Sequence, residues 1–156
     1  MPQKISYITK EEYCDLPIPI LLESEFANRR FGLINNNGVS LKFAWQSDLI
    51  EPDLLKISED HYLIGIDQNF AILKFSPLMI ELKIALLSNY VSSEVKENKI
   101  YVSSELEVFI LSGQSYQIEK RYLLPDVFEH LNFSNGEIMI ECLDGNSYKL
   151  SDLQIS

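Results

Sequence analysis

Residue types that could do chemistry are scarce in this chain and poorly spaced for catalysis. Its 156 residues contain two histidines, His61 and His130, and two cysteines, Cys14 and Cys142. Neither cysteine lies near a histidine in the sequence, and the Gly-x-Ser-x-Gly motif of a nucleophile elbow does not occur. Cys-x-x-Cys, His-Glu-x-x-His, calcium-loop and glycine-rich phosphate-binding patterns are also absent. We therefore expect no catalytic residue, no metal site and no cofactor, and we interpret the chain as non-enzymatic.

One segment, residues 47–56, mixes acids with large aliphatic side chains outside any expected strand, and Pro52 disfavours a regular strand there. One interpretation is a loop that packs its leucines over the open end of a sheet. The other is a binding surface with apolar anchors and an acidic rim, since loops on rigid β scaffolds often carry binding residues. With the acids that follow, the candidate partner-binding residues are Leu49, Glu51, Asp53, Glu59, Asp60 and Asp67.

The charge balance narrows the class of partner. Thirteen Lys and Arg stand against twenty-three Asp and Glu, which gives a formal net charge of −10 without any basic patch. A negative surface repels phosphate groups, so we expect no nucleic-acid and no membrane partner. Solubility alone explains such a charge, and a protein partner with a basic surface is the sharper interpretation.

Compartment is suggested by the N-terminus and the cysteines. No apolar segment follows the first residues as in a signal peptide, and the longest apolar runs are far too short to cross a membrane. We expect a cytoplasmic protein whose two thiols are reduced and buried.

The elements that must position these residues are predicted to be β-strands. Apolar and polar residues alternate with a period of two in several segments, as in half-buried antiparallel strands. Asn-Gly and Asp-Gly pairs punctuate the runs and favour tight hairpins. Short helices are expected only at residues 47–56 and 125–131, so helix should stay under about 15%. Apolar positions that share a strand face include Val39, Leu41, Phe43 and Trp45, and also Ile80, Leu82 and Ile84.

An internal repeat organises the rest of the chain. Residues 57–62, 95–100 and 133–138 align at an offset of 38, and no gap is needed between Tyr62 and Ile138. We expect Ile57, Val95 and Phe133 to occupy equivalent buried positions, and residues 62–99 and 100–137 to form similar meanders.

A unit of about 40 residues with about four short strands resembles a β-propeller blade. The resemblance covers residues 57–150 and identifies no specific family, because the signatures of WD40 and kelch repeats are absent. The expected fold is all-β, with antiparallel meanders in propeller-blade-like repeats of about 38 residues. A β-sandwich is the alternative. We expect a single domain over residues 1–156, with N-terminal strands and a hairpin at 1–56, and two repeats plus a truncated third at 57–150.

These observations predict a non-catalytic protein-interaction domain. Its concrete form would be an acidic immunity or inhibitor protein that neutralises a basic partner, such as a nuclease toxin. The alternatives are a small-molecule-binding module or an enzyme whose catalytic residues are not adjacent in sequence, and a structural subunit of a larger assembly. A deep pocket with converging polar groups would favour the enzyme or ligand-binding module, and a shallow acidic face would favour the interaction domain.

Overall fold

The computed structural model describes residues 5–24 and 28–155. The chain is almost entirely β, with 57% strand and 6% helix, which confirms the all-β prediction and the expected upper limit on helix. In the part of the chain that the structure describes, no helix is long and apolar enough to cross a membrane.

The chain divides into two compact units, residues 1–85 and 86–156. The boundary lies between β7 (Leu78–Ala85) and β8 (Tyr90–Lys96), inside the region of the predicted repeats. Each unit has a hydrophobic core of its own, so the single-domain organisation expected from the length stays a prediction.

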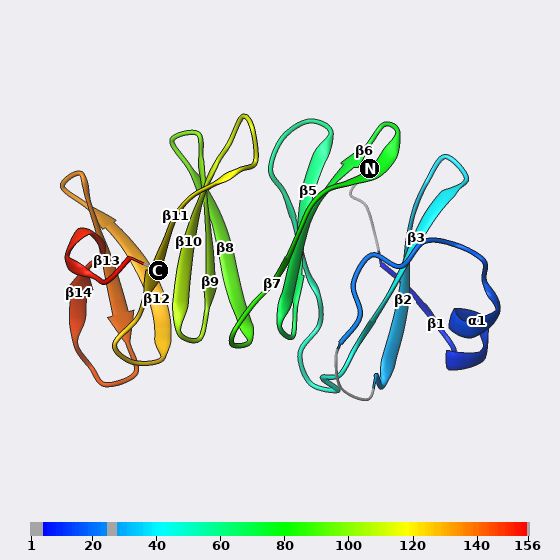
Figure 1. Cartoon of the computed structure of the whole chain (residues 1–156), viewed down its shortest axis with the longest axis horizontal. Coiled ribbons are helices and arrows are strands. Elements are labelled where there is room, and N and C mark those ends of the chain that lie inside the picture. Colours follow the sequence, from blue (N-terminus) through cyan, green and yellow to red (C-terminus); the bar gives the residue numbers. More distant parts are fainter. Residues whose placement is uncertain (1–4, 25–27, 156) are drawn as a thin grey trace. The chain divides into compact units, whose positions relative to one another are not determined.

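The first unit contains two antiparallel sheets (Figure 1). One has the order β1-β2-β3, and the other has the order β4-β5-β6-β7. The Asn37-Gly38 turn joins β2 to β3 with positive φ at both residues, 51° and 83°, so the hairpin expected there is confirmed. The strands are β1 (Ser6–Ile8), β2 (Arg30–Asn36), β3 (Val39–Trp45), β4 (Asp53–Lys56), β5 (His61–Ile66), β6 (Asn69–Phe75) and β7.

Residues 19–22 extend the first sheet beyond β3. The Leu21 amide donates to the Lys42 carbonyl at 2.7 Å, and the Lys42 amide donates to the Pro19 carbonyl at 3.0 Å. The bridge between Ile20 and Lys42 is parallel, unlike the pairs within the named sheets. Both edges of β3 are therefore paired along this stretch.

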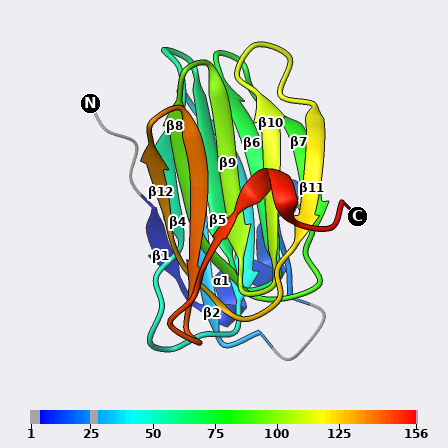
Figure 2. The same cartoon turned by 90° about the vertical axis from the view of Figure 1, so that its left-hand side faces the viewer.

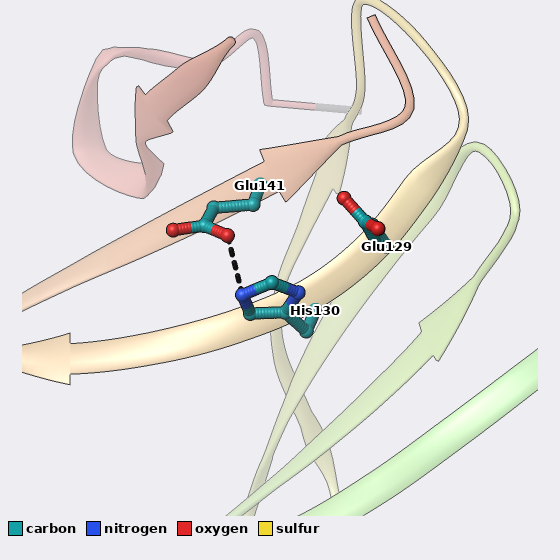
Figure 3. Close-up of side chains that lie close together, drawn as sticks. All are labelled: Glu129, His130 and Glu141. Carbon is teal, nitrogen blue, oxygen red and sulfur yellow. Dashed lines mark ion pairs between the residues drawn. The ribbon is translucent and has the colours of Figure 1, made fainter. Parts of the chain in front are cut away.

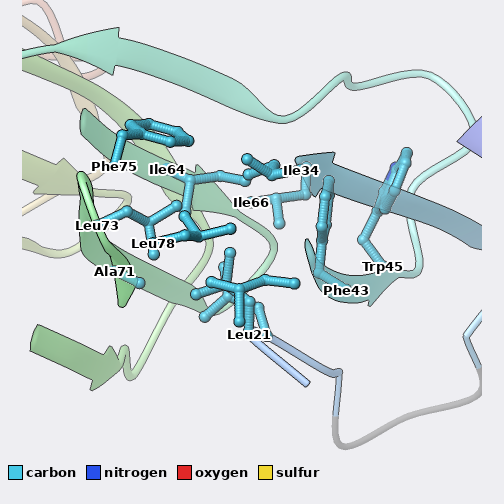
Figure 4. Packing of buried hydrophobic residues seen from close by; sticks show 12 residues of the cluster. Leu21, Ile34, Phe43, Trp45, Ile64, Ile66, Ala71, Leu73, Phe75 and Leu78 are labelled. Carbon is cyan, nitrogen blue, oxygen red and sulfur yellow. The ribbon is translucent and has the colours of Figure 1, made fainter. Parts of the chain in front are cut away.

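The core of the first unit lies between its two sheets. Figure 4 shows the aromatic pair Phe43 and Trp45 of β3 near aliphatic side chains of β5 and β6. The two rings are stacked at 5.2 Å and are fully buried. The cluster also contains Leu21, Leu22, Ile34, Leu41, Ile64, Ile66, Ala71, Leu73, Phe75 and Leu78.

The short helix α1 (Lys10–Asp15) covers the other face of the first sheet. Its Tyr13 packs on Phe31 of β2, with ring centroids 4.9 Å apart, and on Ala44. Thr9 caps the helix through a reciprocal capping box with Glu12. The prediction of short helices at 47–56 and 125–131 is wrong, because these segments contain β4 and the start of β12. Pairing with a neighbouring strand overrides the weak local helix propensity.

The second unit also has two antiparallel sheets, in the orders β8-β9-β10-β11 and β12-β13-β14. At the free edge of β11, Ile155 bridges Tyr122, and Figure 2 shows the C-terminal segment beside this strand. Between the sheets lie Val108, Tyr122, Leu124, Phe128, Ile140, Cys142 and Leu150. The remaining elements are β9 (Lys99–Ser104), β10 (Glu107–Ser112), β11 (Ile118–Leu123), β12 (Phe128–Ser134), β13 (Glu137–Cys142), β14 (Ser147–Lys149) and the 3-10 turn η1 (Leu150–Asp152).

The 38-residue repeat is visible in the strand positions. The strands β5, β9 and β13 start at His61, Lys99 and Glu137, which are 38 residues apart. Each sheet is a meander of consecutive strands, as in propeller blades, whereas sandwiches exchange strands between sheets through Greek-key connections.

The predicted burial of three aligned residues is wrong. Val95 and Phe133 are equivalent, because they pair with Ile100 and Ile138, but Val95 is 45% exposed and Phe133 is half-buried. Ile57 is half-buried and lies one residue beyond β4. All three positions lie at or just past the end of an edge strand, beside a turn, where fewer side chains cover them.

Candidate functional site

The loop between β3 and β4, residues 46–52, holds two exposed aliphatic side chains in the first unit. Leu49 is 94% exposed and Ile50 is 62% exposed. Neither side chain packs over the sheet, so the expectation of a covering loop is wrong for this pair. Exposed apolar patches can mark contact surfaces, and these two adjacent residues are the candidate in this loop.

The start of this loop is fixed by side-chain oxygens. The Gln46 amide donates to Asp67 Oδ2 at 2.6 Å, which ties the loop to the β5–β6 turn. Ser47 Oγ accepts from the amides of Leu49 at 3.3 Å and Ile50 at 2.9 Å. These bonds form a Ser turn that sets the direction of the two aliphatic residues.

The rest of the loop is fixed by ion pairs to β2 and the residue before it. Asp48 lies 3.1 Å from Arg29, and Glu51 lies 3.7 Å from Arg30. The Tyr7 hydroxyl also donates to Glu51. Each such exposed pair contributes little alone, but together they hold both sides of Leu49 and Ile50.

The structure brings only part of the predicted acidic face together. Glu51 and Asp53 precede or begin β4, and Asp67 lies near them because Asp53 pairs with Gly65 at the same end of β5. Glu59 and Asp60 lie at the opposite end of β5, about 20 Å away by the rise of a strand. Their role in partner binding stays a prediction.

Glu59 and Asp60, like Glu51 and Asp67, have partners that the sequence did not indicate. Glu59 lies 3.7 Å from Lys56, and the Asp60 carbonyl accepts from the Phe75 amide at 2.9 Å. The loop is also shorter than expected, because β4 begins at Asp53, directly after Pro52. Proline fits the first position before a strand, where no ladder bond is required.

Open hollows occur in both units. One of about 420 Å³ in the first unit is lined by Tyr7, Thr9, Arg29, Arg30 and their neighbours. Both arginines are the ion-pair partners of the 46–52 loop. This hollow therefore adjoins the segments that fix the loop.

Two further hollows in the second unit, of about 310 and 330 Å³, contain groups with shifted pKa values. Burial, and secondarily the charge of Glu97, raises the pKa of Tyr101. The hydrogen bond and charge of Glu137, 2.7 Å away, raise the pKa of Lys149. Both shifts move the groups away from neutral pH, so neither is poised for proton transfer.

The cysteines are unpaired and differ from each other. Cys142 is buried, as expected, and its burial raises the pKa of its thiol, which disfavours the reactive thiolate. Cys14 is exposed on α1, so its predicted burial is wrong. The helix directs Tyr13 toward the sheet, and the next residue, Cys14, therefore lies on a different face of the helix and is exposed.

A second cluster lies on the β12–β13 hairpin and consists of Glu129, His130 and Glu141 (Figure 3). One ligand atom from each side chain lies within 4.8 Å of the others, and His130 Nε2 contacts Glu141 Oε2. A register shift lies between the pairs Phe128–Cys142 and His130–Glu141, which is a β-bulge at Glu129. In a regular strand Glu129 and His130 would point to opposite faces, and the bulge lets both reach Glu141.

Our sequence interpretation missed this cluster, although the sequence could have indicated that His130 and Glu141 lie opposite each other. The Asn135-Gly136 turn fixes the hairpin register, and counting outward from the Ser134–Glu137 pair places His130 opposite Glu141. The bulge that adds Glu129 had no signal in the residues themselves.

Comparisons with known proteins show the fold and no family. No family model matches the sequence, and no curated protein matches it. The computationally designed Ika4 protein has a similar structure, with a TM-score of 0.52 at 10% identity over 86% of this chain and 91% of that one. Sqt1 of Saccharomyces cerevisiae gives a TM-score of 0.51 at 11% identity over 85% of this chain and 44% of its own.

The β-propeller domain of Cps50 (Swd1) from Myceliophteria thermophila gives 0.48 at 12% identity, over 84% of this chain and 53% of that domain. Sqt1 is also a β-propeller protein, and the match to this chain spans less than half of its length. The likeness to Sqt1 confirms the resemblance to propeller blades.

Proposed function

We propose that the chain is a non-catalytic protein-interaction module that binds a protein partner through the 46–52 loop. The observation that carries this proposal is the exposure of Leu49 and Ile50 on a loop whose two sides are fixed by Asp67, Asp48 and Glu51. The propeller-like fold hosts many functions, so the site carries the argument.

The energetics favour such a role. Full burial of a leucine or isoleucine side chain contributes about 1.5–3 kcal/mol, which an apolar pocket on a partner would supply. A loop that is already ordered loses less conformational entropy on binding than a flexible one. In this proposal Glu51 and Asp67 act by positioning the two aliphatic anchors.

The finer form of the proposal is an inhibitor or immunity protein that acts on a basic partner. The net charge of −10 supports it, since a long-range field of that sign speeds encounter with a positive surface. At the loop itself Arg29 and Arg30 offset Asp48 and Glu51, so the charge effect comes from the whole surface. The two unpaired thiols are consistent with a cytoplasmic site of action.

The test begins with capture of partners from the native host on the immobilised wild-type chain, followed by kinetics with the purified partner. We expect the double variant Leu49→Asp/Ile50→Asp to bind at least about tenfold more weakly, because it places two charges in an apolar contact. The matched control is Leu143→Asp, a similarly exposed leucine (64%) in the second unit. It should bind like the wild type.

Retention of wild-type affinity by the double variant would exclude the loop as the binding surface. Glu51→Gln tests the positioning role of Glu51. It removes the ion pair to Arg30 but adds no charge to the apolar contact. Its association rate should fall less than its dissociation rate rises, as expected when a loop becomes less ordered. A basic partner should also associate more slowly as salt rises.

A further inference from the structure

The side chains of Glu129, His130 and Glu141 are a ligand set of mixed type. An imidazole nitrogen suits zinc and its neighbours among the transition metals, and carboxylate oxygens complete such sites. Mg²⁺ and Ca²⁺ instead prefer sites made of oxygen alone. One histidine with two glutamates therefore favours an ion of the Zn²⁺ type.

The three ligand atoms lie near enough to one another to meet on one ion after side-chain rearrangement. Ligand atoms that share one zinc ion lie about 3.3 Å apart, because each is about 2.0–2.2 Å from the metal. The three ligand atoms here lie within 4.8 Å of one another. Glu129 is exposed, and the His130 and Glu141 side chains are 53% and 35% exposed, so small rotamer changes bring the ligand atoms together.

The repeat provides an internal comparison. The bulge of β12 recurs in β8, 38 residues earlier, where the register shifts between Tyr90 and Ser92. The residues equivalent to Glu129, His130 and Glu141 in that sheet are Val91, Ser92 and Ser103. The bulge is thus a backbone feature of both sheets. Of these two equivalent sites, only the one on β12 and β13 carries three side chains that could bind a metal ion.

We propose that Glu129, His130 and Glu141 bind one divalent transition-metal ion of the Zn²⁺ type, with water in the remaining coordination positions. The two carboxylates supply the negative charge that attracts the cation, and the His130 imidazole supplies the nitrogen that selects a transition metal. The ion would link β12 to β13 across the bulge, where the regular ladder is interrupted. The proposal is independent of the 46–52 loop, which lies in the other unit.

Isothermal titration calorimetry of the untagged full-length chain with Zn²⁺ tests the proposal. The exposed Cys14 is replaced by serine in every protein, because a free thiolate is itself a zinc ligand. We expect one Zn²⁺ per chain, and binding at least about tenfold weaker in each of Glu129→Gln, His130→Gln and Glu141→Gln. His61→Gln is the matched control: this histidine lies 3.8 Å from Glu81, and its loss should leave zinc affinity unchanged.

Thermal unfolding gives a second measurement that does not depend on heats of binding. Zn²⁺ should raise the midpoint of the Cys14→Ser chain and of its His61→Gln variant, but not of its His130→Gln variant. Excess Mg²⁺ should fail to displace Zn²⁺. The proposal would be overturned if the chain bound no stoichiometric Zn²⁺ or if Mg²⁺ displaced the Zn²⁺. It would also be overturned if His61→Gln weakened zinc binding as much as His130→Gln.

Discussion

At the scale of single residues, several carboxylates of the first unit accept hydrogen bonds or form ion pairs that fix nearby segments. Asp67 accepts the Gln46 amide, Glu51 contacts Arg30 and Tyr7, and Glu23 accepts from the Tyr13 hydroxyl at 3.3 Å. Each contact fixes a segment that local propensity leaves undetermined. Some acidic side chains near the loop therefore stabilise its conformation, in addition to any effect of the net charge on partners.

Tyr13 offers a test of this role through pH. Burial, followed by the charge of Glu23 and its hydrogen bond, raises the pKa of Tyr13 from 10.0 to about 12. Between these values the unfolded chain loses the phenol proton and the folded chain keeps it, so stability is full below pH 10 and is lost as pH rises toward 12. We expect the unfolding free energy of the wild type to fall more steeply over this range than that of Tyr13→Phe. Urea unfolding of both proteins at several alkaline pH values measures it, and parallel curves would contradict the assignment.

At the scale of elements, a buried lysine connects α1 to β3. Lys42 is 8% exposed, and its Nζ donates to the carbonyls of Tyr13 at 2.6 Å and Leu16 at 2.8 Å. These carbonyls lie at the C-terminal end of α1, where a cation is favoured and orphan acceptors need donors. The same ammonium lies 4.7 Å from the centre of the Tyr13 ring. One side chain thus satisfies the end of a helix that is too short to be stable alone.

Replacement of this lysine by methionine should destabilise the first unit. Lys42→Met keeps the length of the side chain but removes its hydrogen bonds to the Tyr13 and Leu16 carbonyls, which costs about 1.5–3 kcal/mol for bonds to a charged group. Urea unfolding at neutral pH measures the loss. The control is Lys83→Met on the exposed face of β7, where a change within about 0.5 kcal/mol is expected. Equal effects of the two substitutions would show that the link to α1 has no special role.

At the scale of the whole molecule, the division into two compact units separates the two hydrophobic clusters. Phe43 belongs to the cluster of the first unit and Ile140 to that of the second, and both are fully buried. The described members of each cluster all come from one unit.

Hydrogen exchange of two core variants tests how independent the units are. Phe43→Ala should cost about 3–5 kcal/mol and Ile140→Ala about 2–5 kcal/mol. We expect Phe43→Ala to raise amide exchange in β2 to β7 before β9 to β14, and Ile140→Ala to show the reverse order. Uniform loss of protection in both variants would instead show one cooperative domain, as the length of the chain suggests.

The sequence by itself determined the features that depend on near neighbours. Alternation with a period of two indicates strand faces, the Asn37-Gly38 pair indicates a hairpin, and recurrence at 38 residues indicates the spacing of equivalent strands along the chain. Residues 10–15 also carried a readable helix signal in Thr9 and Glu12, which we overlooked.

Only the tertiary structure decided which side chains meet across the chain. Asp67 reaches Gln46 from 21 residues away, and this bond helps turn Leu49 outward, although leucine is most often buried. The bulge at Glu129 likewise arises from pairing with β13, and it completes a cluster that regular alternation would have split. Local propensities act over a few residues, whereas these contacts depend on strand register and on packing between sheets, whose free energy exists only in the folded chain.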